Sequence, residues 1–155
     1  MSRRRRVVVD TNVLVSAVLF EGGNEAQILK SAEKGDIDLF ISPAIFAEFE
    51  DVLSRPRFQL NREEISVASK YVLAVTKLVV PMTSVKTGLR DADDLKVLEC
   101  SLASKASHIV TGDQDLLTLG KFGKATVVTA ATLAWQLRLI HPQPGPREQK
   151  VRKGT

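Results

Sequence analysis

Cysteine and histidine are scarce in this sequence, which has one cysteine and two histidines. Cys100 has no second cysteine with which to form an internal disulfide, so a reducing cytoplasm is the simplest location to expect. His108 and His141 provide no His and Cys cluster for zinc. Any metal bound by this chain is therefore expected to have oxygen ligands.

Long hydrophobic runs are also missing. No apolar stretch approaches the roughly 20 residues that a membrane-spanning helix needs. The arginines at 3–6 and the valines at 7–9 resemble the start of a signal peptide, but Asp10 ends that apolar stretch too early for a signal core. We therefore expect no association with a membrane.

The net charge of +4 is unevenly distributed. The arginines at 3–6 carry four positive charges, and four more cations after His141 are offset there only by Glu148. The two ends together therefore carry more positive charge than the whole chain, so the body from Val7 to Ile140 is slightly acidic. The basic ends either attract phosphates or serve only as solubilising tails. We expect a basic tail at 1–6, one domain at 7–140, and a disordered basic tail at 141–155, which begins with a proline-rich segment.

Short apolar runs alternate along the chain with segments of helical periodicity. The expected strands cover residues 7–10, 37–41, 77–80, 108–110 and 126–128. The expected helices cover residues 11–20, 24–34, 43–55, 62–74, 91–105 and 130–139, with a short helix around Leu116. This alternation predicts an α/β fold, in which a mostly parallel sheet is covered by helices on both faces.

Acidic residues follow two of the expected strands. Asp10 ends the first strand, and Asp113 comes three residues after the strand at 108–110. Ligands of open parallel sheets bind outside the carboxyl ends of the strands. Helical phase brings Glu48 to the same edge, because it lies beside the inward face formed by Ile45 and Val52.

The helix at 91–105 supplies a fourth acid. Leu95, Leu98 and Leu102 mark its inward stripe, and Asp94 lies one turn before Leu98 on that side. Asp93 is expected to point towards solvent.

Four carboxylates gathered within about 5 Å would repel each other by roughly 3 kcal/mol per pair at an effective dielectric constant of 20. We therefore expect a cation to bind between them, and oxygen ligands suit Mg²⁺ or Mn²⁺. Such an ion activates water and stabilises negative charge on a phosphate, which is the chemistry of phosphodiester hydrolysis.

Four motifs, taken in order, resemble those of PIN-domain nucleases. The resemblance runs from about Val7 to Leu139, and the motifs are 7-VVVDTN-12, Glu48, 91-DADDLKVLEC-100 and 109-IVTGD-113. It is greatest to the bacterial and archaeal branch that contains the toxins of toxin–antitoxin modules. The resemblance assigns Asp10, Glu48, Asp94 and Asp113 as metal ligands and catalytic acids.

The same resemblance implies a three-layer α/β/α sandwich with a five-stranded parallel sheet. It also implies an endoribonuclease that cuts single-stranded RNA with one or two Mg²⁺ or Mn²⁺ ions. Further implications are a homodimer and a co-encoded antitoxin that blocks the site.

Each acid also has a purely structural interpretation. Asp10 and Asp113 can cap the helices that follow them, Glu48 can be a solvated charge, and Asp94 can favour a helix N-terminus. Only the convergence of all four at one edge favours the metal site.

Four further residues form a second tier. Asp115 resembles an extra acid found in some PIN domains, whereas Asp91 fits an N-cap better than a ligand. Asn12 and Thr111 can orient a carboxylate or a water, or can simply make a local turn hydrogen bond.

Two other functions remain open. In a phosphatase or phosphotransferase Asp10 would be the covalent nucleophile, but the usual Asp-x-Asp opening is missing because residue 12 is Asn. A non-catalytic RNA- or protein-binding PIN module is the other alternative, and the presence of all four acids argues against it.

Overall fold

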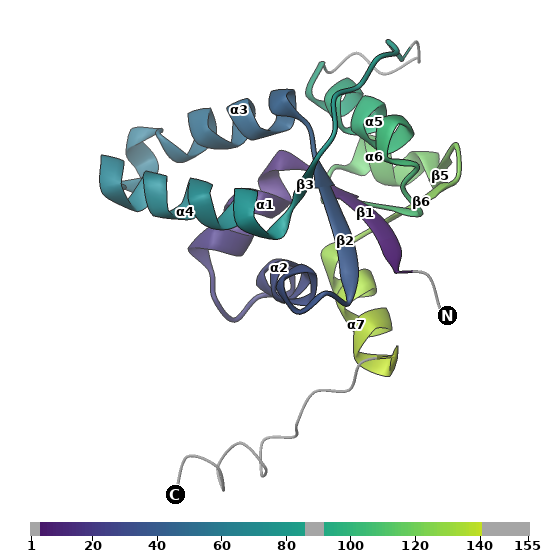
Figure 1. Cartoon of the computed structure of the whole chain (residues 1–155), viewed down its shortest axis with the longest axis horizontal. Helices are drawn as coiled ribbons and strands as arrows, with labels where there is room; N and C mark the ends of the chain where they lie inside the picture. Colours follow the sequence, from purple (N-terminus) through teal and green to yellow (C-terminus); the bar gives the residue numbers. More distant parts are fainter. Residues whose placement is uncertain (1–3, 86–91, 141–155) are drawn as a thin grey trace, which may run out of the picture.

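The computed structural model describes residues 4–85 and 92–140 (Figure 1). Its central sheet has six strands in the order β3-β2-β1-β4-β6-β5. The strands are β1 (Arg5–Val9), β2 (Ile37–Ile41), β3 (Lys77–Leu78), β4 (His108–Val110), β5 (Lys121–Phe122) and β6 (Ala125–Val128). All neighbouring pairs are parallel except β5 with β6. The expected mostly parallel sheet is confirmed.

The expected number of five strands is wrong, because β5 adds an antiparallel sixth strand. This strand has two residues, too few for a periodic pattern to be visible in the sequence. Gly120 and Gly123, on either side of it, have positive φ angles that glycine adopts without strain, so the chain can turn back onto β6.

Helices cover both sides of the sheet (Figure 1). They are α1 (Thr11–Leu19), α2 (Asn24–Lys34), α3 (Pro43–Leu53), α4 (Arg62–Val75), α5 (Ala92–Ser104), α6 (Gln114–Leu119) and α7 (Ala130–Ile140), with a 3₁₀ turn at Pro56–Phe58. Helix α5 packs on β1, β2 and β4, while α2 packs on β2, α1 and α7. The three-layer α/β/α prediction is therefore confirmed.

The central strand β1 forms the middle of the hydrophobic core. Val7, Val8 and Val9 are all buried, as are Leu39 and Ile109 on the strands beside them. Each side chain removed from water in this way contributes about 1.5–3 kcal/mol. Because β1 lies between β2 and β4, its carboxyl end carries Asp10 into the middle of one sheet edge.

The first strand begins earlier than expected. Arg5 and Arg6 belong to β1, where they pair with Ile37 and Asp38 of β2, so the assignment of 1–6 to a tail is wrong for these two residues. Strand pairing uses main-chain groups, which a charged side chain does not prevent when it can reach the surface. The side chain of Arg6 is exposed. The expected tail at 141–155 lies outside the described residues.

Helix ends follow the sequence signals closely. The Ser42 hydroxyl caps α3 by accepting a hydrogen bond from the Ile45 N–H, and Asn61 forms a capping box with Glu64 at the start of α4. Gly35 ends α2 in the left-handed conformation. Within residues 4–85 and 92–140, no helix combines the length and apolar character that crossing a membrane requires.

Candidate metal centre

A hydroxyl group joins the carboxyl ends of β1 and β4. The Thr111 hydroxyl donates a hydrogen bond to Asp10 Oδ2 at 2.8 Å and accepts one from the Asp113 N–H at 3.0 Å. The Asp10 N–H donates to the Val110 carbonyl at 2.9 Å, which continues the pairing of the two strands. Thr111 thus fixes two acidic segments that are about a hundred residues apart in the chain.

Asp10 is 8% exposed, so its carboxyl group is largely shielded from water. Burial raises its pKa, and the nearby charge of Asp113 raises it further. Asp10 occupies the N-cap position of α1 without a standard capping hydrogen bond, although the N–H groups of Asn12 and Thr11 lower the pKa of its carboxyl group. Its short hydrogen bond is the one that it accepts from the Thr111 hydroxyl.

Asp113 has a structural role as well as a place at the site. Its Oδ1 accepts hydrogen bonds from the N–H groups of Asp115 at 2.8 Å and Leu116 at 3.3 Å, so it caps α6. The capping interpretation of Asp113 is confirmed. A cap on the first turn of α6 also determines where Asp115 points.

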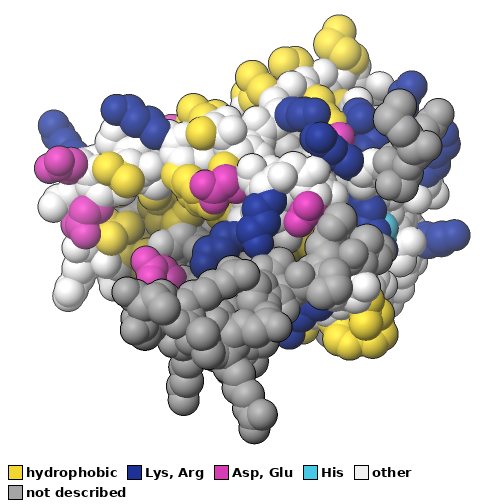
Figure 2. Space-filling model, turned by 60° about the horizontal axis from the view of Figure 1, so that its bottom comes forward, with side chains coloured by type: hydrophobic (Ala, Val, Ile, Leu, Met, Phe, Trp, Pro, Cys, Tyr) yellow, Lys and Arg dark blue, Asp and Glu magenta, His cyan; other side chains and the backbone are white. Residues whose placement is uncertain are grey.

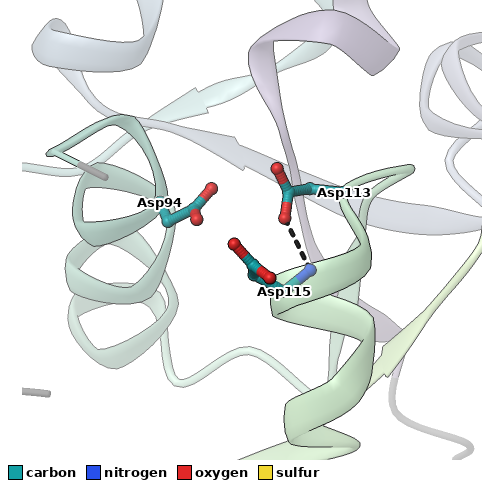
Figure 3. Close-up of side chains that lie close together, drawn as sticks. All are labelled: Asp94, Asp113 and Asp115. Carbon is teal, nitrogen blue, oxygen red and sulfur yellow. Dashed lines mark hydrogen bonds between the residues drawn. The ribbon is translucent and has the colours of Figure 1, made fainter. Parts of the chain in front are cut away.

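Three carboxyl groups meet between α5 and α6. Asp94, Asp113 and Asp115 each offer an oxygen atom, and these atoms all lie within 4.8 Å of one another. Figure 3 shows the three side chains pointing towards a common space, Asp94 from α5 and the others from the start of α6. Two oxygens bound to one Mg²⁺ at about 2.1 Å lie roughly 3–4 Å apart, so the group needs only a small contraction to hold such an ion.

Asp94 lies on the buried side of α5 and is 4% exposed. That side is formed with Val97, Leu98 and Ser101, whereas Leu102 is 44% exposed. The predicted phase of Asp94 is confirmed, but Leu102 was wrongly included in the inward stripe. A carboxyl group placed against the core in this way loses solvation that a bound cation can replace.

Glu48 lies in a second acidic group beside the first. The Thr11 hydroxyl donates a hydrogen bond to Glu48 Oε2 at 2.8 Å. Burial raises the pKa of Glu48, and the hydrogen bond and negative charge of Asp93 raise it further. The hydrogen bond with Glu48 in turn lowers the pKa of Asp93, so the two carboxyl groups interact directly.

Asp93 was expected to point towards solvent, and this is wrong in part. Its side chain is 53% exposed, but it contacts Glu48 and forms an ion pair with Lys96 at 3.2 Å. Lys96 Nζ also lies 3.9 Å from Glu48 Oε2. A lysine therefore approaches the acidic edge from the same helix that carries Asp94.

Comparison with known proteins assigns the family. Residues 6–115 match the sequence profile described as PIN domain, which covers more than half of the chain. The chain belongs to the PIN domain family. It is also 32% identical over 117 residues to the uncharacterized protein MJ1680 of Methanocaldococcus jannaschii, a match that spans 74% of each protein.

A solved structure shows the same fold. The fold resembles a chain in the crystal structure of VapBC2 from Rickettsia felis bound to a DNA fragment from their promoter, with a TM-score of 0.57. The match covers 80% of this chain and 98% of that chain, at 13% sequence identity. PIN domains are usually metal-dependent nucleases, and the acidic group at the sheet edge agrees with such a role.

The predicted site residues of this PIN domain do not all lie in the close group of carboxylates. Among the described residues, the close group contains Asp94, Asp113 and the second-tier Asp115, but neither Asp10 nor Glu48. Asp10 adjoins the group through Thr111 and Asp113. Glu48 approaches it through Thr11, the residue that follows Asp10.

The other second-tier residues have separate outcomes. Asn12 is exposed and lines a hollow of about 270 Å³ together with Thr111 and Gly112. Asp91 lies outside the described residues.

Sequence reasoning missed the contacts made by Thr11, Asp93 and Lys96. The signal for Thr11 was its position, a hydroxyl directly after a strand-ending acid. Asp93 and Lys96 flank Asp94 in the sequence, but their meeting with Glu48 depends on how α3 and α5 pack against each other.

Proposed function

We propose that this PIN domain is a Mg²⁺- or Mn²⁺-dependent endoribonuclease that hydrolyses phosphodiester bonds in single-stranded RNA. The observation that carries the proposal is the meeting of Asp94, Asp113 and Asp115 at the carboxyl edge of a parallel sheet. Mutual repulsion disfavours such a group unless a cation binds there. The PIN family and the oxygen-only donor set both favour a hard divalent ion.

In this proposal the first ion is held by Asp94, Asp113 and Asp115. Asp10 and Glu48 act through water or help to hold a second ion, because they border the group without belonging to it. A bound divalent ion supplies a Lewis acid for the phosphate and lowers the pKa of water.

The protein's own contribution is to orient and shield these carboxylates. Thr111 holds Asp10, and Thr11 holds Glu48, each with a hydroxyl donor at 2.8 Å. Both threonines are buried, so these hydrogen bonds compete little with water. Orienting groups of this kind preserve the ligand geometry that a cation requires.

Cleavage of single-stranded RNA tests the proposal directly. The wild-type protein should cut the RNA with Mn²⁺, stop after EDTA, and recover when Mn²⁺ is restored. Asp94→Asn should be inactive, whereas Asp51→Asn, which changes an exposed acid of α3, should retain full activity. Cleavage that survives EDTA, or equal activity of Asp94→Asn and Asp51→Asn, would refute the proposal.

A phosphatase or phosphotransferase with Asp10 as nucleophile is the alternative enzyme. The shielding of Asp10 and its hydrogen bond to Thr111 both weaken that candidate. Trapping of a phospho-aspartate at Asp10 would establish it. A non-catalytic RNA-binding module would instead bind RNA without metal-dependent cutting.

We also propose that the protein is the toxin of a toxin–antitoxin module, that it acts in the cytoplasm, and that it forms a homodimer. The fold of the VapBC2 chain supports a partner protein. An apolar hollow of about 620 Å³ between α1, α2 and α4 is a surface where a partner can bury hydrophobic side chains. Figure 2 shows hydrophobic side chains gathered in a hollow on the left of the face drawn.

Two measurements test these partners. Expression of the protein with and without its neighbouring gene should show growth arrest only without it, and the two products should co-purify. Light scattering of the purified protein should give the mass of two chains, whereas the mass of one chain would contradict the homodimer.

A further inference from the structure

A basic hollow lies at the end of the sheet opposite the acidic group. Arg4, Arg6, Lys105 and Lys124 line it, with Asp38 as its acidic member, and its volume is about 710 Å³. These residues are called here the amino-end hollow. In Figure 2, Lys and Arg side chains gather mainly on the right of the face drawn, while most Asp and Glu side chains lie on its left and in its middle.

The topology of the sheet brings these cations together. The amino ends of parallel strands share one edge, so the residues before and within β1 meet the turn between β5 and β6 there. Arg4 and Arg6 come from the first segment, and Lys124 comes from that turn. Lys105 follows the last residue of α5 in a left-handed conformation, with φ of 53°. Four cations from three segments thus line one surface.

Arg6 is held in place before any ligand binds. Its Nε donates a hydrogen bond to the Ser104 carbonyl at 2.7 Å, and its guanidinium carbon lies 4.5 Å from the centre of the Phe40 ring. The bond neutralises the negative carbonyl end of α5, which would otherwise repel an anion. The two Nη nitrogens carry the other four N–H donors of the group, in the planar arrangement that suits phosphate oxygens.

Asp38 only partly offsets the charge of the hollow. It pairs with Arg4 at 3.5 Å and with Lys77 at 3.0 Å, so one carboxylate is shared by two cations. Arg6, Lys105 and Lys124 are exposed and add further positive charge. Cations concentrated on one surface in this way favour a ligand with several negative charges.

We propose that the amino-end hollow binds the sugar–phosphate backbone of RNA, as a second contact remote from the metal centre. The inference rests on the proposed function, since RNA is the polyanion that the catalytic edge requires. The hollow is open and much larger than one phosphate, which favours a polymer over a single anion. Along β1, Arg6 and Asp10 are separated by about 13 Å at 3.3 Å per residue, so only an RNA that extends beyond the cleavage site reaches both.

The test is binding of a fluorescein-labelled single-stranded RNA, followed by anisotropy in EDTA so that no cleavage occurs. The variant Lys105→Gln/Lys124→Gln removes two exposed cations of the hollow. Its matched control, Arg62→Gln/Lys70→Gln, removes two exposed cations from α4. Thermal melting of both variants verifies that they fold.

We expect the first variant to bind RNA about threefold more weakly or worse at low salt, and the control to bind like the wild type. The slope of log K against log salt should become shallower by about 0.7 for each phosphate that the variant no longer neutralises. An equal loss of affinity in both variants would show that only overall charge matters and would overturn the proposal. Unchanged affinity in both, or tighter binding of a polyglutamate peptide than of RNA to the wild type, would also overturn it.

Cleavage distinguishes failure of this inference from failure of the nuclease proposal. With Mn²⁺, the variant should cut a short oligonucleotide like the wild type but have a higher KM for a long one. Metal-dependent cutting with no change in KM for the long RNA would support the nuclease proposal and contradict RNA binding at the amino-end hollow. RNA binding at the amino-end hollow without any cutting would support the role of the hollow and contradict the nuclease proposal.

Discussion

At the scale of single residues, the acidic edge of the sheet depends on how its buried carboxyl groups are held. Burial raises the pKa values of Asp10 and Glu48, which lie far apart in the chain, and Asp94 on α5 is 4% exposed. The two threonine hydroxyls bound to Asp10 and Glu48 offset part of that cost. Substitutions that remove a charge should therefore differ in effect from those that remove a hydroxyl.

Asp10→Asn should increase the stability of the metal-free protein at neutral pH. Burial raises the pKa of Asp10, so folding favours its neutral form. That contribution is complete below the unfolded pKa, near 3.8, and is lost as the pH rises through the folded value. We expect a gain of about 1 kcal/mol, or roughly 2–4 °C in Tm, that disappears in acid.

Melting curves in EDTA across a pH series measure this difference. Asp51→Asn is the control, since that side chain is 74% exposed. A stability difference for Asp10→Asn that does not change with pH would contradict the assignment of a raised pKa.

Thr11→Val should impair Glu48 without removing it. Valine has nearly the same shape as threonine but lacks the hydroxyl that donates to Glu48 at 2.8 Å. We expect Mn²⁺ affinity or the cleavage rate to fall about tenfold, as is usual when a group that orients a ligand is removed. Because this bond lowers the pKa of Glu48, the acid limb of the pH–rate profile should move to higher pH.

Thr76→Val is the matched control for Thr11→Val. The Thr76 hydroxyl donates to the Val72 carbonyl at the end of α4, away from the acidic edge. If both variants keep wild-type activity and the same pH profile, Thr11 has no positioning role.

At the scale of elements, α6 connects helix capping to the proposed metal site. The first turn of α6 is closed by Asp113, and that turn presents Asp115 to Asp94. Capping needs an oxygen acceptor, which asparagine also provides, whereas metal binding needs the charge. Two substitutions at one position can therefore separate these roles.

Asp113→Asn should lose Mn²⁺ binding while keeping wild-type stability in EDTA. Asp113→Ala should lose the metal and also about 1 kcal/mol of stability, since it leaves the first turn of α6 without its cap. Calorimetric Mn²⁺ titration and thermal melting measure the two effects. Retained Mn²⁺ affinity in the asparagine variant would remove Asp113 from the ligands.

The sequence predicted those elements whose signals are local. The strands β1, β2, β4 and β6 each contain a short apolar run, and the caps at Ser42 and Asn61 use standard residues. Strand β5 could not be predicted, because its two residues pair through a turn that depends on the neighbouring strand. The sequence pattern did not place Arg5 and Arg6 in β1, because their charged side chains interrupt the apolar run although their main-chain groups pair with β2.

The site was predictable to the same extent. Strand ends placed Asp10 and Asp113, and helical phase placed Asp94 on a buried face. The proximity of Asp115 to Asp94 depends on the direction of α6, and the contact of Asp93 with Glu48 depends on the packing of α3 and α5. Those arrangements come from tertiary structure, which no local pattern encodes.

At the scale of the whole molecule, the parallel sheet separates two kinds of charge. Acids gather at the carboxyl ends of the strands, and Arg4, Arg6, Lys105 and Lys124 gather at the amino ends. A nuclease benefits from both, because a cation at one end activates the phosphate and basic groups elsewhere hold the rest of the polyanion. This division follows from strand direction and does not depend on the number of charged residues.

The most direct test of the account is a crystal soaked in Mn²⁺ and measured at the manganese absorption edge. We predict an anomalous peak between the carboxyl groups of Asp94, Asp113 and Asp115, with distances of about 2.0–2.3 Å to their oxygens. Any second peak should lie towards Asp10 or Glu48. A fully soaked crystal with no anomalous density among these three aspartates would contradict the metal centre and the nuclease mechanism built on it.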